Sequence, residues 1–212
     1  MNAQGDAAEH SAPSVYNVAN LLTVLRLFLV PVFVTCAVFA EDFTHTWWSL
    51  AASLVFIAAS ATDYVDGWLA RRHGLVTAFG KVADPIADKV LTGAALVLLS
   101  VSDLLPWWVT GLVLLREWGI TGLRVWVIRH GVIAASHGGK LKTVLQIVAI
   151  SWYVWPLPEP FLFLGTWVES VAALGPWLMG AAVVATVVTG VDYVLRALVL
   201  RRRGRRGEAT ET

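Results

Sequence analysis

The chain has 212 residues, of which 57% are hydrophobic and only 15% are charged, and its mean hydropathy is +0.67. About a quarter of the residues in soluble domains are charged, so this composition excludes an ordinary soluble domain and indicates an integral membrane protein. The length and the lack of an internal Gly/Ser linker predict a single domain. The formal net charge is +1, and we expect no nucleic-acid partner.

Polar segments flank the apolar region at both ends. Residues 1–14 lack the basic and apolar regions of a secretory signal peptide, so we expect a disordered leader. Residues 15–20 are expected to form a short interfacial helix on the cytoplasmic surface. Residues 201–212 contain five arginines and are expected to form a frayed cytoplasmic tail that binds anionic lipid. The membrane domain is therefore predicted to cover residues 15–200.

Apolar segments long enough to cross a bilayer as helices follow one another through this domain. They predict an all-α bundle of six transmembrane helices. We place these helices at residues 22–39, 48–70, 85–101, 107–129, 141–156 and 174–199.

The charges between these segments predict the orientation in the membrane. The connections after the first, third and fifth segments contain acidic residues but no Lys or Arg. The opposite side carries Arg71, Arg72, Lys81, Arg129, Lys140, Lys142 and the arginines of the tail. Because basic residues accumulate on the cytoplasmic side, both termini and the basic loops are predicted to be cytoplasmic, in a multi-pass protein of the cell membrane.

Four aspartates lie near the cytoplasmic ends of the second and third segments. Ionisable side chains within membrane spans are costly and are functional by default. Asp63 and Asp66 are three residues apart and share a helix face, and Asp84 and Asp88, four apart, share another. Two antiparallel helices joined by a short loop would aim all four carboxylates at one point.

Clustered carboxylates repel one another and need positive charge nearby. Lys89 and Arg71 are candidates for part of it, and hard divalent cations with oxygen ligands are better ones. Mg²⁺ or Mn²⁺ is favoured over Zn²⁺ because no Cys or His cluster accompanies the acids. The alternative is a buried salt-bridge network that only specifies packing.

The residues Asp63-Tyr64-Val65-Asp66-Gly67-Trp68-Leu69-Ala70-Arg71, followed after eight residues by Gly80, Asp84 and Asp88, form a long and specific pattern. It resembles the motif D-x-x-D-G-x-x-A-R, eight residues, G-x-x-x-D-x-x-x-D of the CDP-alcohol phosphatidyltransferases, and all eight fixed positions are filled. The resemblance implies a six-helix membrane enzyme, typically a homodimer, that transfers a phosphatidyl group from CDP-diacylglycerol to an alcohol.

The resemblance also implies roles for the motif residues. Asp63, Asp66 and Asp84 would bind two metal ions, with Asp88 at the second ion and as the candidate general base. The CDP part of the substrate would lie against Asp63, Asp66, Gly67, Ala70, Arg71 and Gly80. Positioning and charge neutralisation are expected to contribute more than proton abstraction, because the metals weaken Asp88 as a base.

Three further segments resemble the branch of the family whose acceptor is glycerol 3-phosphate. They are Asn20–Arg26, Arg116–Trp118 with Arg124, and Gly138–Thr143 with Gln146. The predicted phosphate-binding residues are Arg116, Arg124, Lys140, Lys142 and Arg196. Asn20, Thr23 and Arg26 either line the pocket entrance or cap and anchor the first helix. The alternative for Arg116 is an ion pair with Glu117 or with an acid on a neighbouring helix, and the pair with Glu117 is disfavoured because adjacent helix residues point apart.

Other functions stay open from the sequence. Within the family, the acceptor could be inositol 1-phosphate, phosphatidylglycerol or serine. Outside it, a divalent-cation transporter also carries intramembrane acids. A transporter is expected to place them near the midplane and to contain repeats, and neither feature is found here. A structural scaffold gives no reason to keep four acids together.

Overall fold

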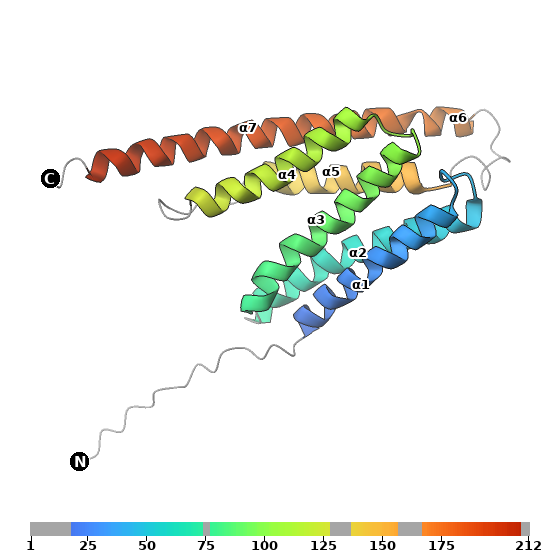
Figure 1. Ribbon diagram of the computed structural model, residues 1–212, viewed down its shortest axis with the longest axis horizontal. Coiled ribbons are helices and arrows are strands. Elements are labelled where there is room, and N and C mark those ends of the chain that lie inside the picture. Colours follow the sequence, from blue (N-terminus) through green and yellow to red (C-terminus); the bar gives the residue numbers. More distant parts are fainter. Residues whose placement is uncertain (1–17, 74–76, 128–136, 157–166, 209–212) are drawn as a thin grey trace, which may run out of the picture.

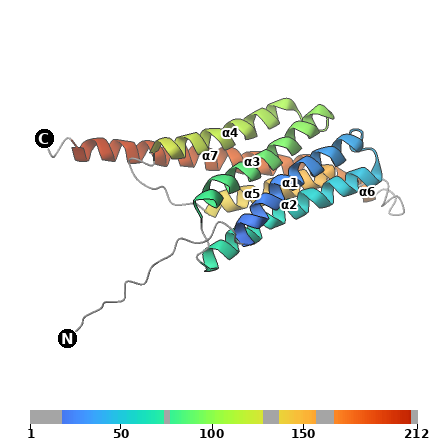
Figure 2. The same cartoon turned by 60° about the horizontal axis from the view of Figure 1, so that its bottom comes forward.

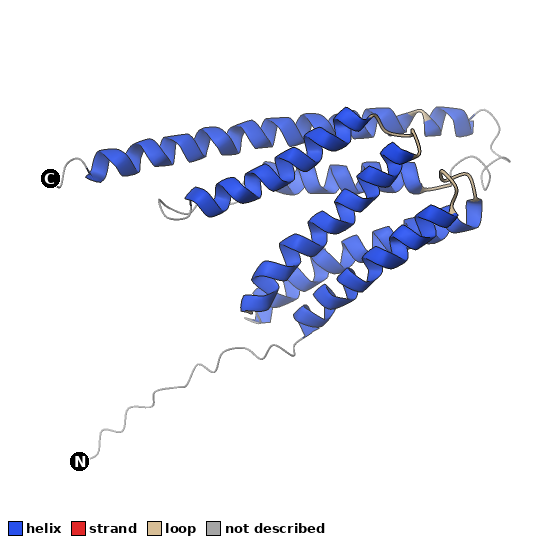
Figure 3. Ribbon diagram, viewed as in Figure 1, coloured by secondary structure: helices blue, strands red, loops and turns tan. Residues whose placement is uncertain are grey.

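The computed structural model describes residues 18–73, 77–127, 137–156 and 167–208. These residues form helices and short connections and contain no strand, which confirms the predicted all-helical class (Figure 3). In chain order the helices are α1 (Val18–Phe39), α2 (Thr46–His73), α3 (Ala78–Val101), α4 (Trp107–Val127), α5 (His137–Val154), α6 (Trp167–Ala172) and α7 (Leu174–Glu208).

The six long helices coincide with the six predicted segments, and the differences lie at their ends. Helix α7 continues through Glu208, so most of the predicted frayed tail is helical, and residues 209–212 lie outside the described residues. Residues 18–20 form the first turn of α1 rather than part of a separate interfacial helix. Residues 15–17 and the predicted leader lie outside the described residues. The short helix α6 was not predicted.

The long helices pack in two groups of three (Figure 1). In the first group α1 contacts both α2 and α3, and in the second α7 contacts both α4 and α5. Contacts of α3 with α4 and α5, and of α2 with α5, join the groups. The turned view shows the same division, with α1 beside α2 and α4 beside α7 (Figure 2). Helices α2 and α3 of the first group and α4 and α5 of the second therefore meet where the groups join.

The core is built from apolar side chains that face the inside of the bundle. Phe33 of α1 and Phe56 of α2 are fully buried, with ring centroids 5.5 Å apart, a separation typical of favourable aromatic pairs. Between α3 and α4, the buried hydroxyls of Ser100 and Thr110 lie 2.7 Å apart, and Thr110 also donates to the Leu96 carbonyl at 3.1 Å. These bonds satisfy polar groups that would be costly to bury alone.

The outer surface is strongly apolar. Two helical segments, Asn20–Phe39 and Ser170–Leu200, are long and apolar enough to cross a membrane. Most of their side chains are not buried inside the bundle, and Leu115 on α4 is 77% exposed. Exposed apolar surface on this scale requires lipid or a partner to cover it. Together with the composition, it indicates a membrane protein.

Candidate active site

One face of α1 carries polar side chains into the bundle. Asn20, Thr23 and Arg26 follow one another at intervals of three residues, which places them on the same side of the helix. All three are buried, and Arg26 is fully so. A charged group buried in a membrane helix needs a partner of opposite charge. The partners of this face lie on α2 and α3.

Arg26 bridges the first two aspartates of the motif. Its Nη1 atom lies 2.8 Å from Asp63 Oδ1, and its Nη2 atom donates to Asp66 Oδ2 at 2.5 Å. Asp66 is almost fully buried, whereas the Asp63 side chain is 41% exposed. The three-residue spacing of the aspartates lets one guanidinium reach both. Arg26 therefore supplies the positive charge that the sequence led us to seek in Lys89 and Arg71.

The third aspartate is held by the same face of α1. Thr23 Oγ1 donates to Asp84 Oδ1 at 2.5 Å. Thr77 caps the start of α3 by accepting from the Gly80 backbone N–H at 3.0 Å, and it donates to Asn20 Oδ1 at 2.8 Å.

Gly80 is required where these groups meet. A Cβ atom at this position would lie 3.1 Å from Asn20 Oδ1 and 3.5 Å from Asp84 Oδ2. Because that space is already taken by polar side chains, a larger residue at position 80 would crowd Asn20 of α1.

The chemistry of these carboxylates fits a divalent cation, although they are not gathered as a ligand set. No three acidic, His or Cys side chains converge closely enough to hold a metal ion in the part of the chain that the structure describes. Arg26 and Thr23 each bond to oxygens of these carboxylates and hold them in place. These carboxylates offer only oxygen donors, and two of them already pair with the buried Arg26. Oxygen donors of this kind are suited to Mg²⁺ or Mn²⁺.

A small cavity lies beside the fourth aspartate, between the two groups of helices. It is lined by side chains of α3, α4 and α5. These are Asp88, Lys89, Thr92, Gly93, Leu96, Val113, Leu114, Glu117, Lys142, Thr143, Gln146 and Ile147. Its walls thus combine an apolar floor with two acids and two lysines, which suits a small, charged and hydroxylated ligand.

Asp88 lines the cavity and interacts electrostatically with residues of both groups of helices. It interacts electrostatically with Asp63 and Arg26, which belong to the first group of helices. It also interacts with Lys142 and Glu117, which belong to the second. A ligand in the cavity would therefore reach the aspartate cluster through Asp88.

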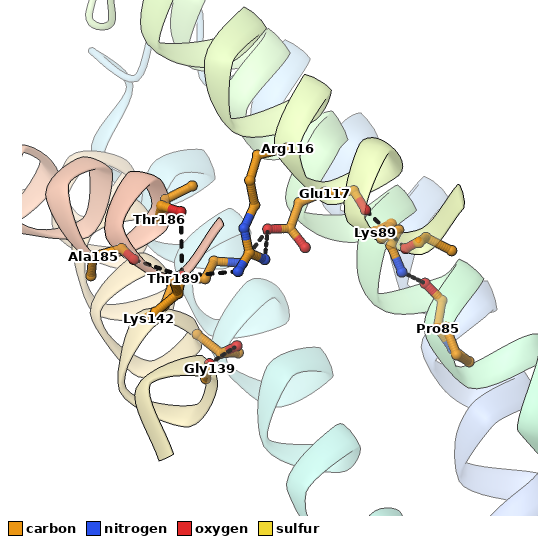
Figure 4. A network of polar contacts seen from close by, with 11 residues as sticks. Pro85, Lys89, Arg116, Glu117, Gly139, Lys142, Ala185, Thr186 and Thr189 are labelled. Atoms are coloured by element: carbon orange, nitrogen blue, oxygen red, sulfur yellow. Dashed lines mark hydrogen bonds and ion pairs between the residues drawn. The ribbon is translucent and has the colours of Figure 1, made fainter. Parts of the chain in front are cut away.

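Two cations meet at Glu117 beside the cavity (Figure 4). Glu117 and Lys142 line the cavity, whereas Arg116 is not among the lining residues. Lys142, which is buried, donates to Glu117 Oε1, and Arg116 Nη1 lies 3.1 Å from the same oxygen. Arg116 and Glu117 therefore form the pair that the sequence left open as an alternative but disfavoured. Both side chains are long enough to turn toward α5 and α7, where they meet although their Cα–Cβ bonds diverge. Glu117 thus holds two cations close together.

Helix α7 holds the side chain of Arg116 in place. The Nη2 atom of Arg116 donates to Thr189 Oγ1 at 2.9 Å (Figure 4). The neighbouring Gly190 is buried, and a Cβ atom there would lie 3.2 Å from Arg116 Cγ. The absence of a side chain at residue 190 therefore lets the arginine stem lie against the helix.

The remaining predicted site residues lie apart from this cavity or carry no described side-chain contacts. Lys140 is exposed, and Arg196 pairs with Asp192 on its own helix at 2.9 Å while remaining more than half exposed. Neither is among the residues that line the cavity. Gly67, Ala70 and Arg71 lie in the last turns of α2, and Arg124 lies near the end of α4.

Some residues of the site were not predicted. Thr189 and Gly190 sit on α7 and reach the site only through Arg116. Gln146 belongs to a segment that the sequence singled out, but no role was assigned to it. Its spacing of four residues from Lys142 on one helix was the available signal.

Comparisons with known proteins bear on this arrangement. The family model described as CDP-alcohol phosphatidyltransferase matches residues 16–192. A protein of Mycobacterium tuberculosis named "Probable phosphatidylglycerophosphate synthase" is 51% identical over 184 residues, which cover 87% of this chain and 83% of that protein. A Bacillus subtilis protein named "CDP-diacylglycerol--glycerol-3-phosphate 3-phosphatidyltransferase" is 38% identical over 84% of this chain and 94% of its own length. The chain belongs to the CDP-alcohol phosphatidyltransferase family.

Proposed function

We propose that this protein transfers the phosphatidyl group of CDP-diacylglycerol to glycerol 3-phosphate and releases CMP. The observation that carries the proposal is the cavity in which Asp88 faces the pair of Glu117 and Lys142. Similarity to relatives whose names include glycerol 3-phosphate supports this choice of acceptor.

The reaction exchanges one phosphorus–oxygen bond for another. A hydroxyl oxygen of glycerol 3-phosphate attacks the phosphorus that bears diacylglycerol. The bond from that phosphorus to the phosphate oxygen of CMP breaks, and the hydroxyl proton passes to Asp88. Asp88 is suited to this role because it lines the cavity and interacts electrostatically with the aspartate cluster.

Two divalent cations, Mg²⁺ or Mn²⁺, would be held by Asp63, Asp66, Asp84 and Asp88. When bound, such ions neutralise the pyrophosphate and the departing CMP. Gly67, Ala70, Arg71 and Gly80 would border the CDP moiety. The match of these four positions to the family motif supports this assignment.

The acceptor phosphate would bind at Arg116 and Lys142. Both are largely buried, and both are paired with Glu117. A phosphate dianion is a stronger partner for these cations than one carboxylate. When the phosphate binds, Arg116 and Lys142 would thus exchange contacts with Glu117 for contacts with the phosphate, and no further cation from solution would be needed. Arg124, Lys140 and Arg196 would contribute further positive charge to acceptor binding, although Lys140 and Arg196 do not line the cavity.

The enzyme would lie in the cell membrane with six helices crossing it and both termini in the cytoplasm. The lengths of the six long helices and the distribution of Lys and Arg support this topology. Gly180 and Ala181 are exposed on α7, and small exposed residues favour close packing of a second copy, as a homodimer requires.

An acceptor panel tests the proposed function. Purified protein would be given CDP-diacylglycerol and Mg²⁺ with glycerol 3-phosphate, inositol 1-phosphate, phosphatidylglycerol or serine in separate reactions, and CMP release would be measured. We expect release with glycerol 3-phosphate alone. Release with another acceptor would contradict the assigned acceptor, and release with none would contradict phosphatidyl transfer itself.

A further inference from the structure

We infer that Gln146 binds the hydroxyl of the acceptor that does not react, and thereby selects a polyol phosphate over an alcohol phosphate that lacks this group. The inference rests on the proposed function and names a contact that neither the motif nor the relatives' names contain. It would make Gln146 a specificity-determining residue.

The first observation is an unsatisfied polar atom. Gln146 is only 4% exposed, and its Oε1 atom has no hydrogen-bond partner among the residues that the structure describes. A buried carbonyl oxygen without a partner is costly, and native structures retain few of them. A ligand hydroxyl would satisfy this atom by donating to it.

The second observation is the position of Gln146 in the cavity. It lies four residues after Lys142 on α5, so both side chains are on the same face and about 6 Å apart along the helix axis. Both line the cavity, as does Asp88 of α3. A three-carbon acceptor with its phosphate at Lys142 and its reacting hydroxyl at Asp88 would place its middle carbon beside this wall.

The neighbouring hydroxyl on the same wall is already engaged. Thr143 also lines the cavity, but its Oγ1 atom donates to the Gly139 carbonyl at 3.1 Å, one turn earlier on α5 (Figure 4). Thr143 therefore serves as a matched control. It shares the position in the cavity but not the unsatisfied atom.

The test compares two acceptors and two protein variants. Glycerol 3-phosphate and 3-hydroxypropyl phosphate differ only in the middle hydroxyl. We expect the parent protein to prefer glycerol 3-phosphate by about tenfold in kcat/KM, the effect of one buried hydrogen bond. In Gln146→Met, which keeps the side-chain volume, the preference should fall to within about twofold, mainly through KM. In Thr143→Val the tenfold preference should persist.

The outcomes separate this inference from the proposed function. Equal use of both acceptors by the parent protein, or an undiminished preference in Gln146→Met, would overturn the role of Gln146 while leaving the transfer reaction in place. Turnover of neither acceptor by the parent protein would overturn both. If Gln146→Met does not fold, Gln146→Ala gives the same comparison, because the preference ratio is independent of the fraction of active protein.

Discussion

Arg26 on α1 donates to Asp66 on α2 at 2.5 Å across 40 positions of sequence, and both side chains are buried. The same guanidinium also pairs with Asp63. The first helix, which lies outside the aspartate motif, therefore supplies the charge that allows two motif carboxylates to share one helix face.

Replacing Arg26 should destabilise the protein through the charges it leaves behind. Arg26→Gln keeps much of the side-chain volume but leaves Asp66 buried without its cation, which costs about 3–5 kcal/mol in comparable buried pairs. Thermal unfolding in detergent would measure the loss. Arg196→Gln, which removes an exposed pair with Asp192, should change stability by no more than about 0.5 kcal/mol. Equal effects of the two substitutions would show that Arg26 does not neutralise the cluster.

Thr23 should matter through Asp84 rather than through packing. Thr23→Val retains the shape of the side chain and removes the hydroxyl that donates to Asp84. Hydrogen bonds to charged groups contribute about 1.5–3 kcal/mol, so the Mg²⁺ concentration for half-maximal activity should rise by about tenfold. Thr35→Val is the matched control, because that exposed hydroxyl only bonds the Pro31 carbonyl of its own helix. An unchanged Mg²⁺ dependence in Thr23→Val would contradict the account.

The sequence was sufficient to predict the class of fold, the approximate bounds of the six long helices and the aspartate motif. These features are local, since an apolar run of sufficient length or a fixed spacing can be read without knowing neighbours in space. The cross-helix partners of the motif could not be read in this way. Arg26 was named only as a pocket or anchoring residue, because nothing in its own segment indicates that it reaches α2.

Glu117 is a second residue whose contacts could not be predicted from its own segment. Adjacent helix positions diverge at Cβ, and this rule disfavoured a pair between Glu117 and Arg116. The rule fails here because Lys142 and Thr189 draw both side chains toward the same place. Tertiary contacts of long side chains thus override a correct statement about backbone direction.

Removal of divalent metal should abolish activity reversibly. Asp63, Asp66 and Asp84 offer hard oxygen donors, and the reaction moves a charged pyrophosphate. CMP release should therefore cease in the presence of a chelator and return with added Mg²⁺ or Mn²⁺. Ca²⁺, which tolerates irregular coordination and longer bonds, should restore much less. Full activity in the chelator would exclude a catalytic metal.

Gly190 should control the position of Arg116. In Gly190→Ala the new methyl group would press on the arginine stem, which is held by Thr189 and Glu117. Crowding of this kind costs about 1 kcal/mol or more, so KM for glycerol 3-phosphate should rise by about fivefold while KM for CDP-diacylglycerol stays constant.

The matched control lies on the same helix. A Cβ atom at Gly180 meets nothing within 4 Å, so Gly180→Ala should leave both KM values unchanged. Parallel increases in both KM values for Gly190→Ala would instead indicate a general disturbance of packing.

Asp88 lines the cavity and interacts electrostatically with Asp63, and we propose that it takes part in phosphatidyl transfer to glycerol 3-phosphate. The most direct measurement is the rate of CMP release from CDP-diacylglycerol, with and without glycerol 3-phosphate, for the parent protein, Asp88→Asn and Asp192→Asn. Asp192 lies outside the cavity and pairs with Arg196 at 2.9 Å. We expect CMP release to depend on glycerol 3-phosphate. Its rate should fall by about 10²-fold or more in Asp88→Asn and should be unchanged in Asp192→Asn. Release by folded Asp88→Asn at the parental rate would contradict this role of Asp88.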